Sequence, residues 1–328
     1  MSLEATPSRN VLLNVLNNLR TMEPISSLIN CREGSLWIAM AVVLQAGQIL
    51  LISEVTHSIG AFEASFVRSS FLLCTLLFIS WRNSETYGFI ELVNYILTGL
   101  GDSLYIVLAA LASNYIWVGD CSAIVLNQPI PSAILACIIL GEAMDKTDSV
   151  LVFLNACGLV LVSKPSFLFP QSDEIAEPPP TTQPFVGILL ASGSLASTVT
   201  ATLSTRSLAY RNTEDPFLIG TMAALHGIVL SCLGLVITSS SFTLPHNASE
   251  WLLTLLLGIC GTGALCCYAK SLESEEVLTV TVFMTLGIPL NHMFDLIFLD
   301  REIDWWKLGG IVLIIASTFA MYIKSKLR

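Results

Sequence analysis

Charged residues are scarce in this sequence. Only 12% of the 328 residues are Asp, Glu, Lys or Arg, while 54% are hydrophobic and the mean hydropathy is +0.73. A soluble globular domain typically carries about 25% charged residues. The composition therefore excludes an ordinary soluble domain and indicates a membrane protein. The formal net charge of −10 comes from scattered acidic residues and indicates no particular partner.

Enzyme motifs are also missing. The sequence contains no H-E-x-x-H, no G-x-x-x-x-G-K-[ST] phosphate loop and no G-x-S-x-G nucleophile motif. The nine cysteines have no paired spacing, and no basic stretch interleaved with aromatics points to nucleic acid. We therefore expect no enzyme activity, no catalytic residues, no metal, no cofactor and no nucleic-acid partner.

What the sequence does contain is a series of apolar blocks. Each is close to 20 residues long, enough to cross a hydrocarbon core of about 30 Å at about 1.5 Å per residue. All six tryptophans lie at or beside block ends, where the amphipathic ring prefers the headgroup level. We expect an all-α integral membrane protein. Its ten transmembrane helices are predicted at residues 35–54, 61–81, 89–111, 118–140, 148–164, 185–206, 216–238, 250–270, 277–299 and 305–323.

The distribution of lysine and arginine orients the chain. Cytoplasmic loops retain these residues, and a cytosolic N-terminus puts eleven of the fifteen in the cytosol, three outside and one, Arg68, within a span. Both termini are therefore predicted to be cytosolic. The last five residues, 324–328, resemble a K-x-K-x-x signal for return to the endoplasmic reticulum, although a positive-inside flank explains them equally well. We expect the membrane to be that of the endoplasmic reticulum or Golgi, or the plasma membrane.

The chain divides into two halves of five helices. A proline-rich, acidic stretch between them indicates an extended linker. An odd number of spans per half makes the halves enter the bilayer in opposite senses, which is the inverted-repeat plan of many secondary transporters. The predicted parts are an N-terminal tail, the first repeat, the linker, the second repeat and a C-terminal tail. They cover residues 1–34, 35–164, 165–184, 185–323 and 324–328.

Prolines interrupt two of the expected helices at matching positions. Pro129 and Pro131 lie in the fourth, and Pro289 lies in the ninth, 160 positions after Pro129. A proline removes a backbone donor and breaks a helix, which is tolerated in lipid where neighbouring groups or water satisfy the freed carbonyl. Broken spans at matching positions in two halves favour a midplane binding site. A packing kink without a ligand explains either break alone equally well.

The sequence resembles a known transporter family. The run VGDCSAIVLNQPIPSAILACIILGEAMD and the segment GLVLVSKPSFLF resemble the drug/metabolite transporter superfamily, EamA-type. Within it, YAKSLES and DREIDWWKLGGIVLIIAS are similar to solute carrier family 35, subgroup G. The likeness covers roughly residues 35–325 and implies two EamA-like repeats and solute transport. The chain departs from the pattern at 118–121, where VGDC replaces L-A-D-A, and at 275–277, where EEV replaces a glycine-containing turn.

Arg68 is the only basic residue well inside an expected span. A charge in hydrocarbon is costly, so it is a functional hypothesis by default. Asp102 lies at a similar depth on the third helix and is its natural partner. Two interpretations remain open, a permanent salt bridge between the second and third helices and a direct anion-binding role.

Other polar residues would face the same interior. In hydrocarbon they must find partners, in a solute or, more often, in a neighbouring helix. Lys270, at the cytosolic end of the eighth helix, would meet a solute or extend to lipid headgroups. The candidate solute-binding residues are Arg68, Gln45, Gln48, Asp102, Ser194, Thr198, His226 and Lys270.

His292 and Asp295 lie one turn apart on the ninth helix, just beyond Pro289. A histidine and a carboxylate at this spacing can pass a proton, which would couple solute movement to a gradient. They would equally serve to stabilise the kink, and a hydrogen-bonded interior histidine is the more common case.

The sequence thus predicts a secondary transporter of a small organic metabolite, working by alternating access at a midplane cavity. The buried cation favours an anionic solute, and the three prolines are the expected gating positions. Two alternatives remain. A nucleotide-sugar transporter would need a cationic cluster suited to a diphosphate. A non-transporting adaptor would recruit partners through its tails and loops. Membrane lipid and a small solute are the expected partners, and the sequence does not set the oligomeric state.

Overall fold

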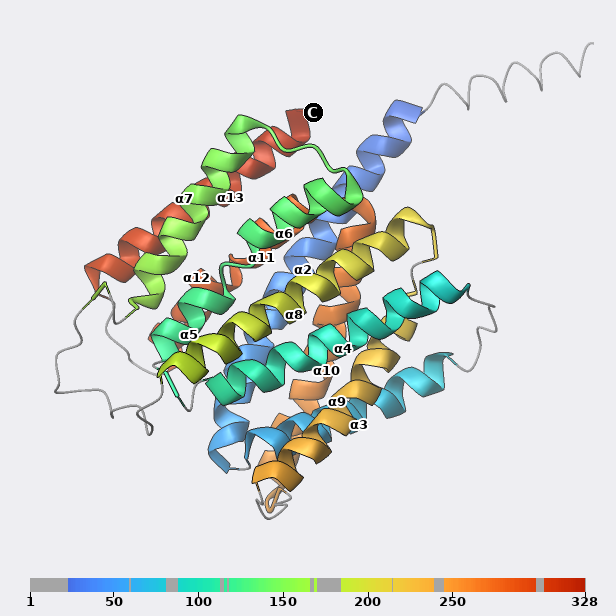
Figure 1. Cartoon of the computed structure of the whole chain (residues 1–328), viewed down its shortest axis with the longest axis vertical. Helices are drawn as coiled ribbons and strands as arrows, with labels where there is room; N and C mark the ends of the chain where they lie inside the picture. The colour runs from blue at the N-terminus through green and yellow to red at the C-terminus, as the bar shows by residue number, and fades with distance from the viewer. Residues whose placement is uncertain are drawn as a thin grey trace, which may run out of the picture.

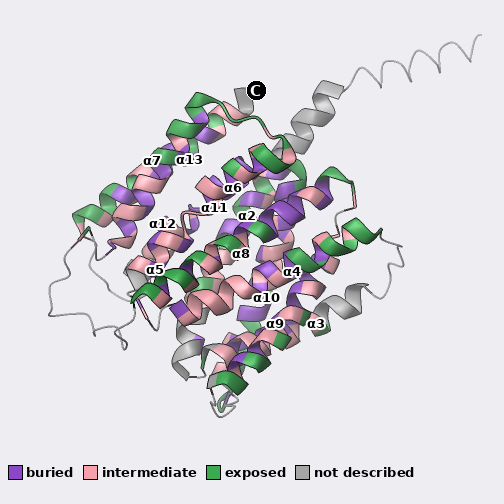
Figure 2. Ribbon diagram, viewed as in Figure 1, coloured by how far each residue is buried: buried purple, intermediate pink, exposed green. Residues whose placement is uncertain are grey.

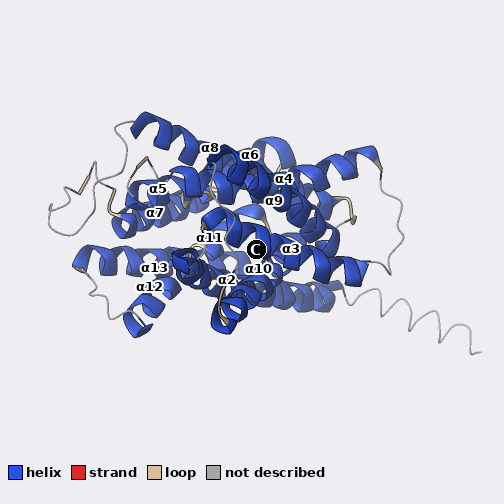
Figure 3. Ribbon diagram, turned by 90° about the horizontal axis from the view of Figure 1, so that it is seen from below, coloured by secondary structure: helices blue, strands red, loops and turns tan. Residues whose placement is uncertain are grey.

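The protein is built from helices (Figures 1 and 3). The computed structural model describes residues 23–58, 60–80, 88–112, 115–116, 118–165, 168–169, 184–213, 215–238, 245–298 and 304–327, and within these ranges every regular element is helical. The elements are α2 (Glu23–Ser58), α3 (Ala61–Ser80), α4 (Phe89–Ala112), α5 (Val118–Val125), α6 (Pro129–Leu135), a π-helical turn η1 (Ala136–Leu140), α7 (Lys146–Ser163), α8 (Pro184–Tyr210), α9 (Pro216–Thr238), α10 (Ala248–Ser274), α11 (Val277–Met284), α12 (Gly287–Phe298) and α13 (Trp305–Leu327).

Eight helical segments in the described part of the chain are long and apolar enough to cross a membrane. This confirms the prediction of an all-helical membrane protein. Two expected spans fall outside these eight. The second corresponds to α3, and the ninth to α11 and α12, which contain the shorter apolar stretch Val277–Met293.

Large apolar side chains cover the outside of the bundle. Ile237 is 80% exposed, Val236 76% and Phe153 64%, and Figure 2 colours much of the periphery as exposed. Burying such side chains stabilises a protein in water by about 1.5–3 kcal/mol each. Their exposure over much of the periphery is favourable in a hydrocarbon surrounding and costly in water.

The four most extensive helix pairings join a helix before the linker to one after it. They are α2 with α10, α3 with α9, α4 with α8, and α7 with α13. In the α4–α8 pair, Asn94 donates a hydrogen bond to Ser207, and Ser194 donates to the carbonyl of Tyr105. The start of α4 therefore lies beside the end of α8, and the pair is antiparallel.

The other three pairs are antiparallel as well. Gly34, where the apolar span of α2 begins, packs against Ser274 at the end of α10, and Gly47, later in α2, lies near Cys260, earlier in α10. In the α7–α13 pair, Lys324 forms an ion pair with Asp148 at 2.7 Å, so the end of α13 lies beside the start of α7. The α3–α9 pair follows the same pattern, with the start of α3 beside the end of α9.

Both spans that carry prolines are interrupted. The fourth breaks at Leu126–Gln128, between α5 and α6, and the ninth breaks at Thr285–Leu286, between α11 and α12. The side-chain amide of Asn127 donates to the carbonyl of Ala123. At the second break, Ile288 donates its N–H to the carbonyl of Thr285. The backbone groups freed at the breaks thus find local partners, as hydrocarbon requires.

The ends of the bundle differ from the expected tails. Helix α2 begins at Glu23, well before residue 35, while residues 1–22 lie outside the described part. At the other end α13 continues to Leu327. Lys324, one lysine of the K-x-K-x-x pattern, contacts Asp148 and also Asp145 at 3.3 Å. It therefore packs against α7 in this conformation instead of belonging to a free tail.

Glycine at the α7–α13 crossing permits close backbone approach. A Cβ on Gly310 would lie 2.7 Å from the carbonyl oxygen of Gly158, whereas a Cβ on Gly309 would meet nothing within 4 Å. We expect Gly310→Ala to lower stability by about 1–3 kcal/mol through overpacking. Gly309→Ala is the matched control and should keep or raise stability, by up to about 1 kcal/mol, because alanine is the better helix former. Thermal unfolding of the two variants in detergent tests this, and equal midpoints would contradict the packing.

Candidate functional site

A cavity of about 390 Å³ lies where the two halves meet. Its walls come from α2, α3, α4, α8 and α10, and both helix breaks contribute to it through Gln128 and Thr285. Small-molecule sites typically occupy about 300–1,000 Å³ and combine an apolar wall with a few polar groups. Among the described lining residues only Arg68 and Asp102 carry a formal charge.

Arg68 is held by α3 with its guanidinium between helices. The residue is 8% exposed, and its Nε has no hydrogen-bond partner among the described residues. The guanidinium lies against Gly261 of α10, where an added Cβ would come 2.7 Å from Nε. A glycine at this position therefore makes the space that the guanidinium occupies. A buried donor left unsatisfied is costly, so such a group is expected to have a partner that binds from the cavity.

Asp102 lines the same cavity from α4. The described residues contain no Arg68–Asp102 ion pair within 4.0 Å, although the two charges are near enough to attract each other. The permanent salt bridge considered from the sequence is therefore absent from this conformation. Both charged side chains line the cavity and can interact with a molecule bound there.

Further polar groups surround these charges. Gln45 and Gln48 of α2 and Thr198 of α8 line the cavity, as expected from the sequence. Asn291 lines it as well, and its buried Oδ1 has no hydrogen-bond partner among the described residues. Asn291 was not predicted as a site residue, whereas its neighbour His292 was. An amide two residues after Pro289 was the available signal, because it lies in the first turn beyond the break.

A hydrogen-bonded chain of side chains joins the first break to the second half. Gln128 donates to the hydroxyl of Thr202 at 2.9 Å, and that hydroxyl lies 2.7 Å from the phenol oxygen of Tyr268. Gln128 and Tyr268 both line the cavity. These residues were also missed, although a glutamine directly before Pro129 marks the break in the sequence.

A second polar cluster contacts the break in the ninth span, at Thr285. The amide of Asn155 on α7 donates to the hydroxyls of Thr285 at 3.0 Å and Ser317 at 3.2 Å. Thr285 faces the cavity. The interrupted ninth span is therefore positioned by side chains of α7 and α13.

Several predicted site residues lie elsewhere. The hydroxyl of Ser194 donates a hydrogen bond to the carbonyl of Tyr105. The Nδ1 of His226 lies 2.7 Å from the carbonyl oxygen of Met222 in the same helix. Lys270 forms an ion pair with Glu273 at the end of α10. None of these three lines the cavity in the described part of the chain.

The predicted proton-coupling pair is only partly described. His292 lies on α12 beyond the cavity-lining Asn291, and the side chain of Asp295 lies outside the described residues. Among the described residues no group of three or more His, Cys, Asp or Glu side chains is placed to hold a metal.

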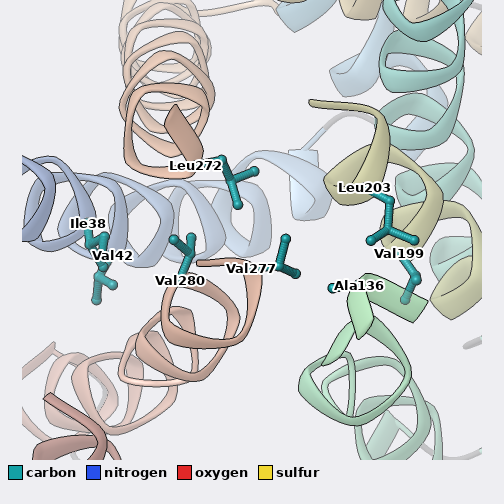
Figure 4. Close-up of a cluster of buried hydrophobic side chains, with 8 residues drawn as sticks. All are labelled: Ile38, Val42, Ala136, Val199, Leu203, Leu272, Val277 and Val280. Atoms are coloured by element: carbon teal, nitrogen blue, oxygen red, sulfur yellow. The ribbon is translucent and has the colours of Figure 1, made fainter. Parts of the chain in front are cut away.

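An apolar layer packs against the cavity lining, since Tyr268 and Met284 belong to the lining and also contact the layer. Figure 4 draws the side chains of this layer, which come from α2, η1, α8, α10 and α11. Each lies between one residue and two turns along the chain from a lining residue, as Val199 does from Thr198 and Leu272 from Tyr268. The layer consists of Ile38, Val42, Ala136, Val199, Leu203, Leu272, Val277 and Val280.

An ion pair between Glu142 and Arg206, here called the latch, lies beside this layer. Glu142 follows Gly141, whose φ of 72° ends η1 in a conformation that favours glycine. The Glu142 carboxylate accepts from the Nε of Arg206 at 2.8 Å on one oxygen and from the N–H of Val277 at 3.0 Å on the other. The hydroxyl of Tyr210 donates to it at 3.1 Å, and the guanidinium stacks over that ring. One carboxylate of the first half thus holds α8 and α11 of the second.

Removing the latch cation should destabilise the protein. The Glu142 and Arg206 side chains are 6% and 10% exposed, and breaking a buried pair by deleting one partner costs about 3–5 kcal/mol. We expect Arg206→Gln to lose about this much stability and the Glu142→Gln/Arg206→Gln double variant to lose less than the sum of the single losses. Chemical denaturation of the four proteins in detergent measures the coupling. Strictly additive losses would show that the two residues do not act as a pair.

Comparison with known proteins identifies the family. A model of the EamA-like transporter family matches residues 32–164 and 185–323. The chain belongs to this family. It is therefore a multi-pass membrane transporter, and the EamA-like family is one of transporters and not of enzymes. The resemblance found in the sequence is confirmed, and the two matched segments correspond to the parts before and after the linker.

Individual relatives are distant in sequence but cover most of the chain. Solute carrier family 35 member G1 of Homo sapiens is 24% identical over 84% of this chain and 74% of its own length. The pseudopaline exporter CntI of Pseudomonas aeruginosa is also 24% identical, over 83% and 89% of the two chains. A solved crystal structure with 13% identity superposes with a TM-score of 0.72, covering 89% of this chain and 97% of the other. The fold is therefore that of a known structure.

Proposed function

We propose that this protein is a secondary transporter that carries a small organic solute by alternating access of two inverted five-helix halves. The solute binds with an anionic group at Arg68. The observation that carries this proposal is a buried guanidinium whose Nε has no hydrogen-bond partner among the described residues and which borders a cavity between the halves. Gln45, Gln48, Thr198 and Asn291 complete the polar lining.

The pairing of helices supports a duplicated, inverted architecture. If the halves are related by a two-fold axis, α2 corresponds to α8 and α4 to α10. The pairs α2–α10 and α4–α8 then exchange, while α3–α9 and α7–α13 map onto themselves. All four pairs are antiparallel, as a chain of ten alternating spans requires. An even number of spans puts both termini on one side of the membrane, and we propose that this side is the cytosol because most Lys and Arg residues then lie there. The linker at 165–184 would lie on the opposite side.

Glycosylation mapping tests the inverted halves. An N-x-[ST] acceptor inserted into the linker at 165–184 should be glycosylated, because an odd number of spans precedes it. The same acceptor on a C-terminal extension should remain unmodified. A shift in gel mobility that is reversed by deglycosylation reports each outcome. Modification of the C-terminal acceptor but not of the linker would refute the proposed topology.

The apolar layer suggests how access alternates. It packs against the cavity lining, and the Glu142–Arg206 ion pair beside it joins the two halves. Opening toward the cytosol would require the latch to part and the layer to separate. The breaks before Pro129 and Pro289 are natural places for this movement, because their helices are already interrupted. A proton passed by His292 and Asp295 remains a prediction.

The lining argues against a nucleotide sugar. A diphosphate is best held by several cationic donors, whereas Arg68 is the single cation among the described lining residues. An adaptor without transport would have no need for a polar cavity of this size. Neither alternative has an observation in its favour.

Uptake into proteoliposomes tests the role of Arg68. Arg68→Gln should reduce uptake of carboxylate solutes about tenfold or more, since a charged hydrogen bond contributes about 1.5–3 kcal/mol, while uptake of neutral solutes should change little. Lys270→Gln removes a cation from α10 outside the cavity and should leave uptake near that of the unmodified protein. Equal loss for both kinds of solute would make Arg68 structural, and no uptake by any form would favour the adaptor.

A further inference from the structure

We propose that the solute is dipolar, carrying a cationic group that Asp102 binds while Arg68 holds its anionic group. This inference rests on the proposed function and narrows its solute class. The substrate is expected to be close to neutral overall, with an ammonium or similar cation and a carboxylate or similar anion on one small molecule.

The first support is the charge balance of the cavity. Its described lining contains one cation and one anion, and every other lining side chain is neutral. A purely anionic solute at Arg68 would lie close to the like charge of Asp102. In a site walled by apolar side chains this repulsion is poorly screened. A cation on the same solute converts that repulsion into attraction.

The second support is that the two charges are not used on each other. No ion pair joins them within 4.0 Å, and the Nε of Arg68 is left without a hydrogen-bond partner among the described residues. Opposite charges held apart in one cavity form a dipole, which is complementary to a solute with the reverse dipole. Electrostatic complementarity of this kind confers specificity more than raw affinity.

The third support is the way each charge is positioned. The guanidinium of Arg68 packs against Gly261 on α10, where no side chain competes for the space. This contact places the cation at the α10 side of the cavity. Asp102 comes from α4, a different helix, one turn before Tyr105, whose side chain also lines the cavity. An aromatic ring beside the carboxylate suits an ammonium group, because ring faces attract cations.

Three-member solute sets test the inference on full-length protein purified in detergent. Each set contains an α-amino acid or ω-amino acid, the same molecule without its amine, and the same molecule without its carboxylate. Binding is read from the rise in the thermal unfolding midpoint. We expect the dipolar member to stabilise the protein most, and its binding to be at least about tenfold tighter than that of the matched carboxylate.

Substitution of Asp102 should abolish the preference for the dipolar member. Asp102→Asn keeps the shape of the side chain and removes its charge, so the dipolar member should lose its advantage while the matched carboxylate binds as well as before or better. Glu91→Gln makes the same charge change in the first turn of α4, away from the cavity lining, where Glu91 accepts the N–H of Gly88. It should keep the preference for the dipolar member.

The outcomes separate the two proposals. Equal stabilisation by the dipolar member and the carboxylate, or a preference that survives in Asp102→Asn, would overturn the dipolar solute but leave the transporter and its anion site intact. A midpoint that no member of any set moves would overturn both. Both proposals would be supported if Arg68→Gln lost all binding and Asp102→Asn lost the preference for the dipolar member.

Discussion

The energetic cost of a charge in hydrocarbon is the constraint on which this structure depends. Arg68 is placed among apolar helices, where an uncompensated guanidinium is unfavourable. The fold offsets this cost in three ways. Asp102 supplies an opposite charge at a distance, Gly261 gives the guanidinium room, and the cavity gives it access to a partner that is not part of the chain. A site that binds solute follows from the same arrangement.

Backbone groups obey the same constraint at the two helix breaks. Each break is a short turn, and side chains of neighbouring helices hold it in place. Gln128 bonds Thr202 at the first, and Asn155 bonds Thr285 at the second. Interrupted helices are thus stable within the bundle and present polar groups to the cavity. The same interruptions leave the fourth and ninth spans as the parts of the bundle least constrained by continuous helical bonding.

Much of the fold could be predicted from the sequence because the bilayer simplifies the problem. A span must be helical and of a certain length, so hydropathy located the helices to within a few residues in most cases. The site was less predictable. Gln45, Gln48, Arg68, Asp102 and Thr198 do line the cavity. Ser194, His226 and Lys270 do not line it. A polar side chain in a bundle can face either the cavity or a neighbouring helix, and the sequence alone does not distinguish the two.

The sequence by itself determined the membrane class, the helices, the transporter family and the presence of one buried cation, because these depend on local composition and pattern. Only the tertiary structure decided which polar groups meet. It separated Arg68 from Asp102, brought Asn291 and Tyr268 to the cavity, and joined Glu142 to Arg206 across the halves. The physical reason is that these contacts depend on how each helix is rotated and paired, and packing between distant segments sets both.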